Sequence, residues 1–104
     1  MILYNVTLKI DHEVHRKWLA WMKVVYLPNM MKTGLFLEYT ISRLLGTDEV
    51  DGFTYSIQYL TKDFSDYQIF QEKHAARMQR ALHEEYEGKY VVFRTIMKVV
   101  ERGE

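Results

Sequence analysis

The first ten residues alternate between apolar and polar side chains, which is the pattern of a half-buried β-strand. Successive side chains of a strand point to opposite faces of the sheet, so residues 2–10 carry one apolar face and one mostly polar face. The two faces hold Ile2, Tyr4, Val6, Leu8 and Ile10, and Leu3, Asn5, Thr7 and Lys9. We expect the first set to be covered by helices.

Helical periodicity replaces this alternation after Asp11. Aspartate is a common N-cap residue because its carboxylate accepts hydrogen bonds from free backbone N–H groups. Apolar residues then recur at the spacing of one α-helical face, at Val14, Trp18, Trp21, Met22 and Val25. We expect the helix to end before Pro28, because proline disfavours helical geometry at the preceding residue. Residues 27–34 are then predicted to form a loop.

Three further strands are predicted at residues 35–45, 53–60 and 89–101. The segment GTDEVDG lies between the first two of them, and its glycines and aspartates are typical of a hairpin connection.

A second helix is predicted between the last two strands. Ser65 begins it by forming a capping box with Gln68. Gly88 ends it, because glycine readily adopts the left-handed conformation that terminates helices. Its inward stripe is Tyr67, Phe70, His74, Met78, Ala81 and Leu82.

The resulting order, β-α-β-β-α-β, predicts the ferredoxin-like fold. This α+β arrangement is a four-stranded antiparallel sheet with two helices on one face, and we expect residues 1–104 to form one such domain. The strand patterns also predict which later side chains face the helices. They are Leu35, Leu37, Tyr39, Ile41, Phe53, Tyr55, Ile57, Tyr59, Val91, Phe93, Met97 and Val99.

The opposite face of the predicted sheet mixes short polar and apolar groups with few charges. A sheet face open to solvent is expected to carry more Lys and Glu. The simplest cover is a second copy of the chain, because two-fold dimers are the commonest soluble oligomers. We therefore predict a homodimer in which two sheets face each other as a dimeric α+β barrel. Its interface residues are predicted to be Asn5, Thr7, Phe36, Glu38, Thr40, Ser56, Gln58 and Arg94.

Composition narrows the function classes. Fourteen Lys and Arg residues balance 14 Asp and Glu residues, whereas binding to nucleic acid or to an anionic membrane requires a basic excess. No apolar run approaches the length of a membrane span, and the N-terminus lacks a signal-peptide pattern, so we expect a cytoplasmic protein. Without cysteine the chain has no disulfide and no thiolate chemistry.

His74 is the strongest candidate for chemistry, because it lies in the middle of the inward stripe of the second helix. An imidazole can act as a general base near neutral pH or bind a haem iron. A partly buried histidine can equally be a hydrogen-bonded structural residue. His12 and His15 lie on one side of the first helix, but two histidines without a third ligand make a weak metal site. We predict no metal and no cofactor.

Several stretches together resemble a known family. They are YNVTLKID, WLAWM, Pro28, the Thr33-Gly34-x-Phe36 motif, YSIQY and FRTIMKVV. Over nearly the whole chain they resemble the uncharacterised domain-of-unknown-function family 4286. The resemblance implies a dimeric α+β barrel of the group that includes cofactor-free monooxygenases, haem-degrading enzymes and small isomerases. Pockets in that group commonly lie between the sheet and the helices, and the family itself has no assigned activity.

The sequence departs from the family pattern at Tyr26, where the family more often has a histidine before the Leu-Pro pair. A tyrosine there can still donate a hydrogen bond. Haem-degrading relatives use a histidine of the second helix with an asparagine of the first strand. His74 and Asn5 are similar in residue type and element, but Asn5 is expected on the face away from the helices.

We therefore predict a homodimer that binds a small, partly apolar ligand between helices and sheet, with His74 as the catalytic candidate if a cofactor-free reaction occurs. The alternative is a non-catalytic interaction or regulatory module whose aromatic residues are all core, and haem binding is a third hypothesis. An open cavity of roughly 300 Å³ or more that touches His74 or Tyr26 favours ligand binding. The predicted walls are Tyr4, Trp18, Tyr26, Tyr55, Tyr67 and Phe93.

Overall fold

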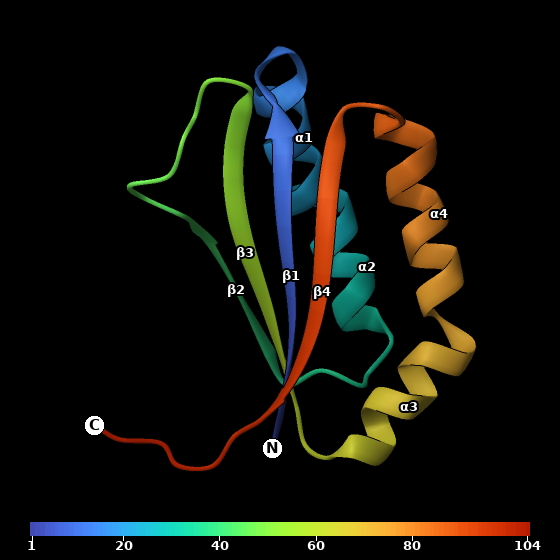
Figure 1. Cartoon of the computed structure of the whole chain (residues 1–104). Helices are drawn as coiled ribbons and strands as arrows, with labels where there is room; N and C mark the ends of the chain where they lie inside the picture. The colour runs from blue at the N-terminus through green and yellow to red at the C-terminus, as the bar shows by residue number, and fades with distance from the viewer.

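The computed structural model describes all residues, 1–104, and contains one four-stranded sheet (Figure 1). Its strands are β1 (Ile2–Asp11), β2 (Glu38–Arg43), β3 (Gly52–Thr61) and β4 (Tyr90–Lys98). They are arranged in the order β2-β3-β1-β4, and every neighbouring pair is antiparallel. Figure 1 shows the helical segments together on one side of the sheet. The predicted ferredoxin-like fold is therefore confirmed.

The central strand β1 sorts its side chains as its alternation predicts. Each residue of the apolar set from Ile2 to Ile10 is buried, and each residue between them is half-buried. The buried set packs beneath the helices with Trp18, Met22, Leu27 and Phe70 in one apolar core. No helix is long and apolar enough to cross a membrane.

The facing of β4 differs from the prediction. Antiparallel pairing with β1 sets Arg94 opposite Val6 and Phe93 opposite Thr7. Arg94 therefore belongs to the helix-covered face, and Phe93 belongs to the open face, the reverse of what we expected. Both alternating sets of β4 contain several apolar residues, so hydrophobicity alone could not choose between them. Only the pairing with β1 determines the register.

The first helix continues beyond the predicted end. A 3-10 turn, η1 (His12–Val14), leads into α1 (His15–Trp21), a π-helical turn η2 (Met22–Tyr26) and then α2 (Leu27–Lys32). Asp11 caps the first turn, as predicted, by accepting from the Glu13 backbone N–H at 2.9 Å.

The π-turn explains why Pro28 does not end the helix. The Leu27 N–H bonds to the carbonyl of Met22, five residues earlier, instead of four. In a regular α-helix the ring of Pro28 clashes with the carbonyl four residues earlier and leaves that carbonyl without a donor. The wider turn comes directly before the proline, which then lies in the first turn of α2, where its missing N–H is tolerated.

The second helix consists of two segments, α3 (Phe64–Lys73) and α4 (Ala75–Tyr86), which are separated by His74. His74 has φ −127° and ψ −29°, outside helical geometry. The N-cap is Asp63, whose Oδ1 accepts from the Asp66 N–H at 2.9 Å. The capping box predicted at Ser65 is therefore wrong by two residues. Gly88 does follow the helix end, with the positive φ of 75° that glycine tolerates.

The chain before β2 reverses the prediction for two residues. Strand pairing begins at Glu38, so alternation does not apply earlier. Phe36 is buried in the core, with its ring centroid 5.1 Å from that of Tyr59 and 5.0 Å from that of Phe70. Leu37 is 57% exposed. The placement of Phe36 on the open face was wrong because that segment is not yet a strand.

Candidate functional site

A half-open cavity of about 420 Å³ lies between the two helical layers of the chain. Small-molecule sites have volumes of roughly 300–1,000 Å³, so this one can hold a small organic molecule. We expected such a cavity between helices and sheet, whereas this one lies between the helix η2–α2 and the helix α4. Its walls are Trp21, Val25, Tyr26, Asn29, Lys32, Thr33, His74, Arg77, Met78 and Ala81.

Both helices are interrupted where they border the cavity. On one side the π-turn η2 places Val25 and Tyr26 on the wall. On the other side the break at His74 separates α3 from α4. Irregular helical turns of this kind occur frequently at functional sites. The two interruptions therefore bring together the two residues that the sequence singled out, Tyr26 and His74.

Tyr26 presents an unpartnered hydroxyl to the cavity. Its side chain is only 9% exposed, yet it forms none of the chain's side-chain hydrogen bonds. Burial raises the pKa of Tyr26 well above its ordinary value, and the nearby Tyr4 adds to this effect. The phenol therefore stays protonated at neutral pH and can donate a hydrogen bond to a ligand.

His74 is held by its neighbour one helical turn away. A terminal guanidinium nitrogen of Arg77 lies 3.0 Å from His74 Nδ1. Arginine can only donate hydrogen bonds, so Nδ1 must accept this one. The neutral imidazole then carries its proton on Nε2. In this arrangement His74 is a hydrogen-bond donor, not a base ready to accept a proton.

The charged residues of the cavity wall are cations. Lys32 and Arg77 line it, and no Asp or Glu does. Neither cation takes part in an ion pair, although Arg43 and Lys89 elsewhere bind Glu49 and Glu13. The cavity therefore has a positive electrostatic character that is not neutralised from within the chain.

A second, enclosed space of about 20 Å³ adjoins the inner wall and is large enough for one water molecule. Tyr26 and Met78 line both spaces, so they separate the outer cavity from the inner one. Tyr4, Tyr59 and Arg94 also line the inner space. Burial raises the pKa of Tyr4 and Tyr59, and the positive charge of Arg94 opposes this rise. These phenols are likewise protonated donors at neutral pH.

The other predicted wall residues lie away from the outer cavity. Trp18 is fully buried and packs on Tyr55, with ring centroids 5.0 Å apart. Tyr67 packs edge-on against Tyr4 at 5.5 Å. Phe93 lies on the open face of the sheet, where it is 70% exposed, so its placement in the wall was wrong.

Six of the eight predicted interface residues do lie on the open face. Asn5, Thr7, Ser56 and Gln58 pair across β1 and β3, and the Asn5 side chain bonds to the hydroxyls of Thr7 and Ser56. Glu38 and Thr40 lie on the same face of β2, because they are paired with Leu60 and Gln58. Phe36 and Arg94 are the two exceptions, for the reasons given above. Their predicted interface role is therefore withdrawn.

Several residues of the cavity wall were missed by sequence reasoning. Asn29, Lys32 and Thr33 fall in a segment that we predicted to be a loop, so no helical face was assigned to them. Arg77 carried a usable signal, because a residue three positions after His74 lies beside it on a helix. The structure adds the bond between these two side chains.

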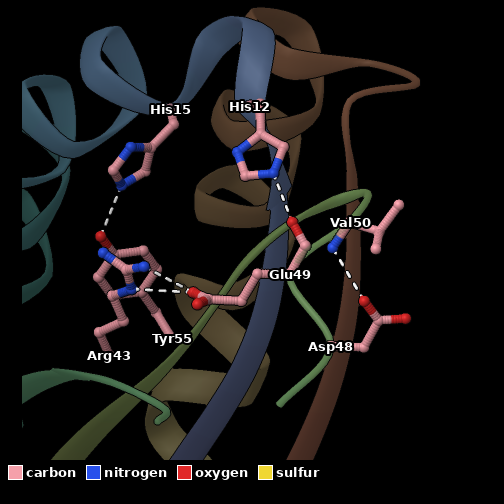
Figure 2. Close-up of polar contacts among 7 residues, drawn as sticks. All are labelled: His12, His15, Arg43, Asp48, Glu49, Val50 and Tyr55. Carbon is pink, nitrogen blue, oxygen red and sulfur yellow. Dashed lines mark hydrogen bonds and ion pairs between the residues drawn. The ribbon is translucent and has the colours of Figure 1, made fainter. Parts of the chain in front are cut away.

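A separate polar cluster joins the start of the first helix to the β2–β3 connection (Figure 2). His12 Nε2 donates to the Glu49 carbonyl at 2.6 Å, and His15 Nε2 lies 2.6 Å from the Tyr55 hydroxyl. Arg43 donates to one Glu49 carboxylate oxygen from two nitrogens, at 3.2 and 2.6 Å. Burial lowers the pKa of His15, as do the positive charges of Arg43 and other nearby groups. The cluster ties the hairpin connection to the helix.

The metal and haem hypotheses have definite geometric outcomes. No group of three or more His, Cys, Asp or Glu side chains is placed to hold a metal ion. Asn5 faces away from the helices, whereas His74 lines the cavity between them. The histidine–asparagine pair of haem-degrading enzymes is therefore not assembled.

The topology and the cavity together define an α+β protein of the ferredoxin-like class with a ligand-sized space between its helices. The chain belongs to the family described as Domain of unknown function (DUF4286), whose model matches residues 1–100. This membership confirms the resemblance found in the sequence. No curated protein matches the chain.

Solved structures with very different sequences share this fold. HapK from Hahella chejuensis has a TM-score of 0.71 at 11% identity, over 100% of this chain and 97% of HapK. A dimeric ferredoxin-like protein from an uncultured marine organism has a TM-score of 0.70 at 14% identity, over 100% and 99% of the two chains. An antibiotic biosynthesis monooxygenase has a TM-score of 0.62 at 16% identity, over 97% and 100%. Likeness at these identities shows the fold alone.

Proposed function

We propose that this protein is a homodimer that binds a small, partly apolar ligand in the cavity between η2–α2 and α4. The observation that carries the proposal is the cavity of about 420 Å³ with both Tyr26 and His74 on its wall. The alternative, a module whose aromatic residues are all core, requires side chains to fill this space. The space is open, so ligand binding is the better interpretation.

The chemistry of the wall supports binding more strongly than catalysis. Tyr26 O–H, His74 Nε2–H and Arg77 N–H groups are all donors, which suits an oxygen-bearing ligand. A cofactor-free monooxygenase or isomerase reaction also needs a base that accepts a proton from the substrate. His74 can serve only in its other tautomer, which breaks its bond with Arg77. We therefore assign His74 a ligand-donor role and retain cofactor-free turnover as the secondary possibility.

The corrected register of β4 supports the homodimer. It removes Arg94 from the open face and adds Val91 and Phe93, which are 62% and 70% exposed. Apart from Asp11 at the end of β1, Lys9 and Glu38 are then the charged side chains of this face. An exposed apolar strand beside a polar network is typical of an interaction surface. The second copy would cover it sheet against sheet.

The test of the ligand proposal is a fragment screen followed by two-dimensional ¹H–¹⁵N NMR. The panel should contain neutral, anionic and cationic aromatic compounds, so that the outcome does not depend on charge. The indole N–H of Trp21, which lines the cavity, is the reporter, and that of fully buried Trp18 is the internal reference. Ala81→Trp fills the cavity, and Ala76→Trp adds the same ring at an exposed position of the same helix.

Binding should shift the Trp21 signal in the wild type and in Ala76→Trp but not in Ala81→Trp. If no compound of any charge shifts that signal at millimolar concentration, the ligand proposal fails.

A further inference from the structure

We propose that the ligand of this cavity is a small organic anion, a carboxylate on an apolar body, with the carboxylate held by Arg77 and Lys32. The inference rests on the proposed function and specifies its ligand class. Four observations carry it: the segregation of polar and apolar wall residues, the two unpaired cations, the unpartnered hydroxyl of Tyr26 and the bond that orients Arg77.

The cavity has a polar end and an apolar end because the two helices run in opposite directions (Figure 1). Along the first helix the wall changes from Trp21 and Val25 to Asn29, Lys32 and Thr33. Along the second it changes in the opposite order, from His74 and Arg77 to Met78 and Ala81. The contact of Trp21 with Tyr86 near the end of α4, with centroids 5.3 Å apart, shows the same alignment. The polar ends of the two walls therefore face each other.

The polar end is cationic. Lys32 and Arg77 contribute two positive charges, no carboxylate lines the cavity, and neither cation has an ion-pair partner. In a chain with as many acidic as basic residues, this local excess is a feature of the site. Charge-assisted hydrogen bonds to carboxylates are about twice as strong as neutral ones, so an anion gains most from this end.

The bond between Arg77 and His74 leaves Arg77 ready to bind a planar anion. Arginine has five N–H donors, and the contact with His74 Nδ1 engages one terminal nitrogen. The remaining donors form a fork that matches the two oxygens of a carboxylate. Thr33 is less available, because its hydroxyl already donates to the Met30 carbonyl at 2.8 Å.

The Tyr26 hydroxyl supplies the third contact. It is buried, protonated and without a partner in the chain, which is costly unless a ligand or a water accepts from it. Its ring lies beside Trp21, with centroids 5.2 Å apart, so this donor adjoins the apolar end. An aromatic or aliphatic body of the ligand then packs against Trp21, Val25 and Met78.

The experiment uses three probes of one shape and different charge: 4-phenylbutyrate, 4-phenylbutanamide and 4-phenylbutylamine. Affinities are measured on the purified protein by Trp21 chemical shift and by calorimetry. The acid should bind at least about tenfold more tightly than the amide, and the amine more weakly than either. Added salt should weaken binding of the acid and leave that of the amide unchanged.

Matched variants assign the anion contacts. Arg77→Gln and Lys32→Gln should each lower affinity for the acid without changing affinity for the amide. Arg80→Gln, an exposed residue of α4 outside the wall, should change neither. Arg77→Lys keeps the charge and loses the fork, so its affinity for the acid should lie between those of wild type and Arg77→Gln. Because Lys32 is exposed, its variant tests the proposal even if changes at Arg77 disturb folding.

Equal binding of acid and amide, or preference for the amine, would overturn the anion assignment. If the Ala81→Trp variant still abolishes that binding, the cavity proposal survives this result. Binding of none of the three probes overturns the anion assignment as well. Together with a silent fragment screen, that outcome also removes the cavity proposal.

Discussion

Tyr26 and His74 line one cavity from opposite helices, and each adjoins an interruption of its helix. The π-turn that ends at Tyr26 accommodates Pro28, and the break at His74 starts α4. Neither interruption is needed to bury the core residues, which lie on the sheet side of both helices. The arrangement concentrates irregular backbone, an unpartnered hydroxyl and a fixed histidine at one place.

Removing the Tyr26 hydroxyl should weaken binding without harming the fold. In Tyr26→Phe the protein loses no internal hydrogen bond, so the free energy of unfolding should stay within about 0.5 kcal/mol of wild type or rise slightly. Affinity for 4-phenylbutyrate should fall by about threefold to tenfold. Urea denaturation and calorimetry measure the two effects. Tyr39→Phe on exposed β2 is the control and should change neither; unchanged binding in Tyr26→Phe contradicts the contact.

Stability should decrease in mild acid because of His15. Its pKa is lowered in the folded protein, chiefly by burial and also by Arg43. As pH falls below the ordinary value of 6.5, the unfolded chain takes up a proton that the native state resists, so the free energy of unfolding decreases. The stabilisation is therefore present above pH 6.5 and is lost towards the lowered pKa.

Denaturant titrations from pH 8 to pH 5, values chosen to bracket the ordinary histidine pKa of about 6.5, measure this dependence. His15→Gln should flatten the acid branch. Tyr55→Phe is the matched control: it removes the hydroxyl beside His15 but keeps the burial and the neighbouring cations, so the branch should remain. Equal slopes in wild type and His15→Gln count against the assignment.

A charge on the open face should separate the dimer. Phe93→Glu places a carboxylate on an exposed apolar position of β4, which costs several kcal/mol if the position is covered without a partner. Light scattering should give twice the chain mass of 12.5 kDa for wild type and the single mass for the variant. Val24→Glu, at a 74% exposed position of the helical side, should remain dimeric. A monomeric wild type at micromolar concentration rejects the homodimer.

The N-cap of α3 can be tested directly, because sequence and structure name different residues. Asp63 Oδ1 accepts from the Asp66 N–H, so Asp63→Ala should lower the free energy of unfolding by about 1 kcal/mol. Ser65→Ala should change it by no more than about 0.5 kcal/mol, since Ser65 is exposed and makes no capping bond. Thermal and urea unfolding measure both. The opposite ranking means that the helix begins at Ser65.

Local pattern predicted the elements and their order well. Period-two alternation in β1 has one register that buries apolar groups, and Asp11 and Gly88 mark helix ends through their own backbone chemistry. The predictions failed where local signals are ambiguous. β4 is apolar on both faces, and Phe36 precedes a strand whose start only the pairing with β3 reveals. Pro28 breaks a regular helix but not one that contains a π-turn.

The candidate site was predicted in part. Tyr26 and His74 stood out as a family departure and as a polar residue on an apolar stripe, and both line the cavity. Lys32, Asn29 and Arg77 did not stand out, because surface cations and amides are common and their convergence is a property of two helices side by side.

The sequence by itself determined the fold class and the helix-covered face of β1, because both follow from the spacing of apolar residues along a single segment. The family membership likewise follows from the chain alone. Only the tertiary structure decided the facing of β4, the site of the cavity and its cationic end. These depend on which residues of separate segments meet, and antiparallel packing of the two helices places Lys32 and Arg77 around the same space.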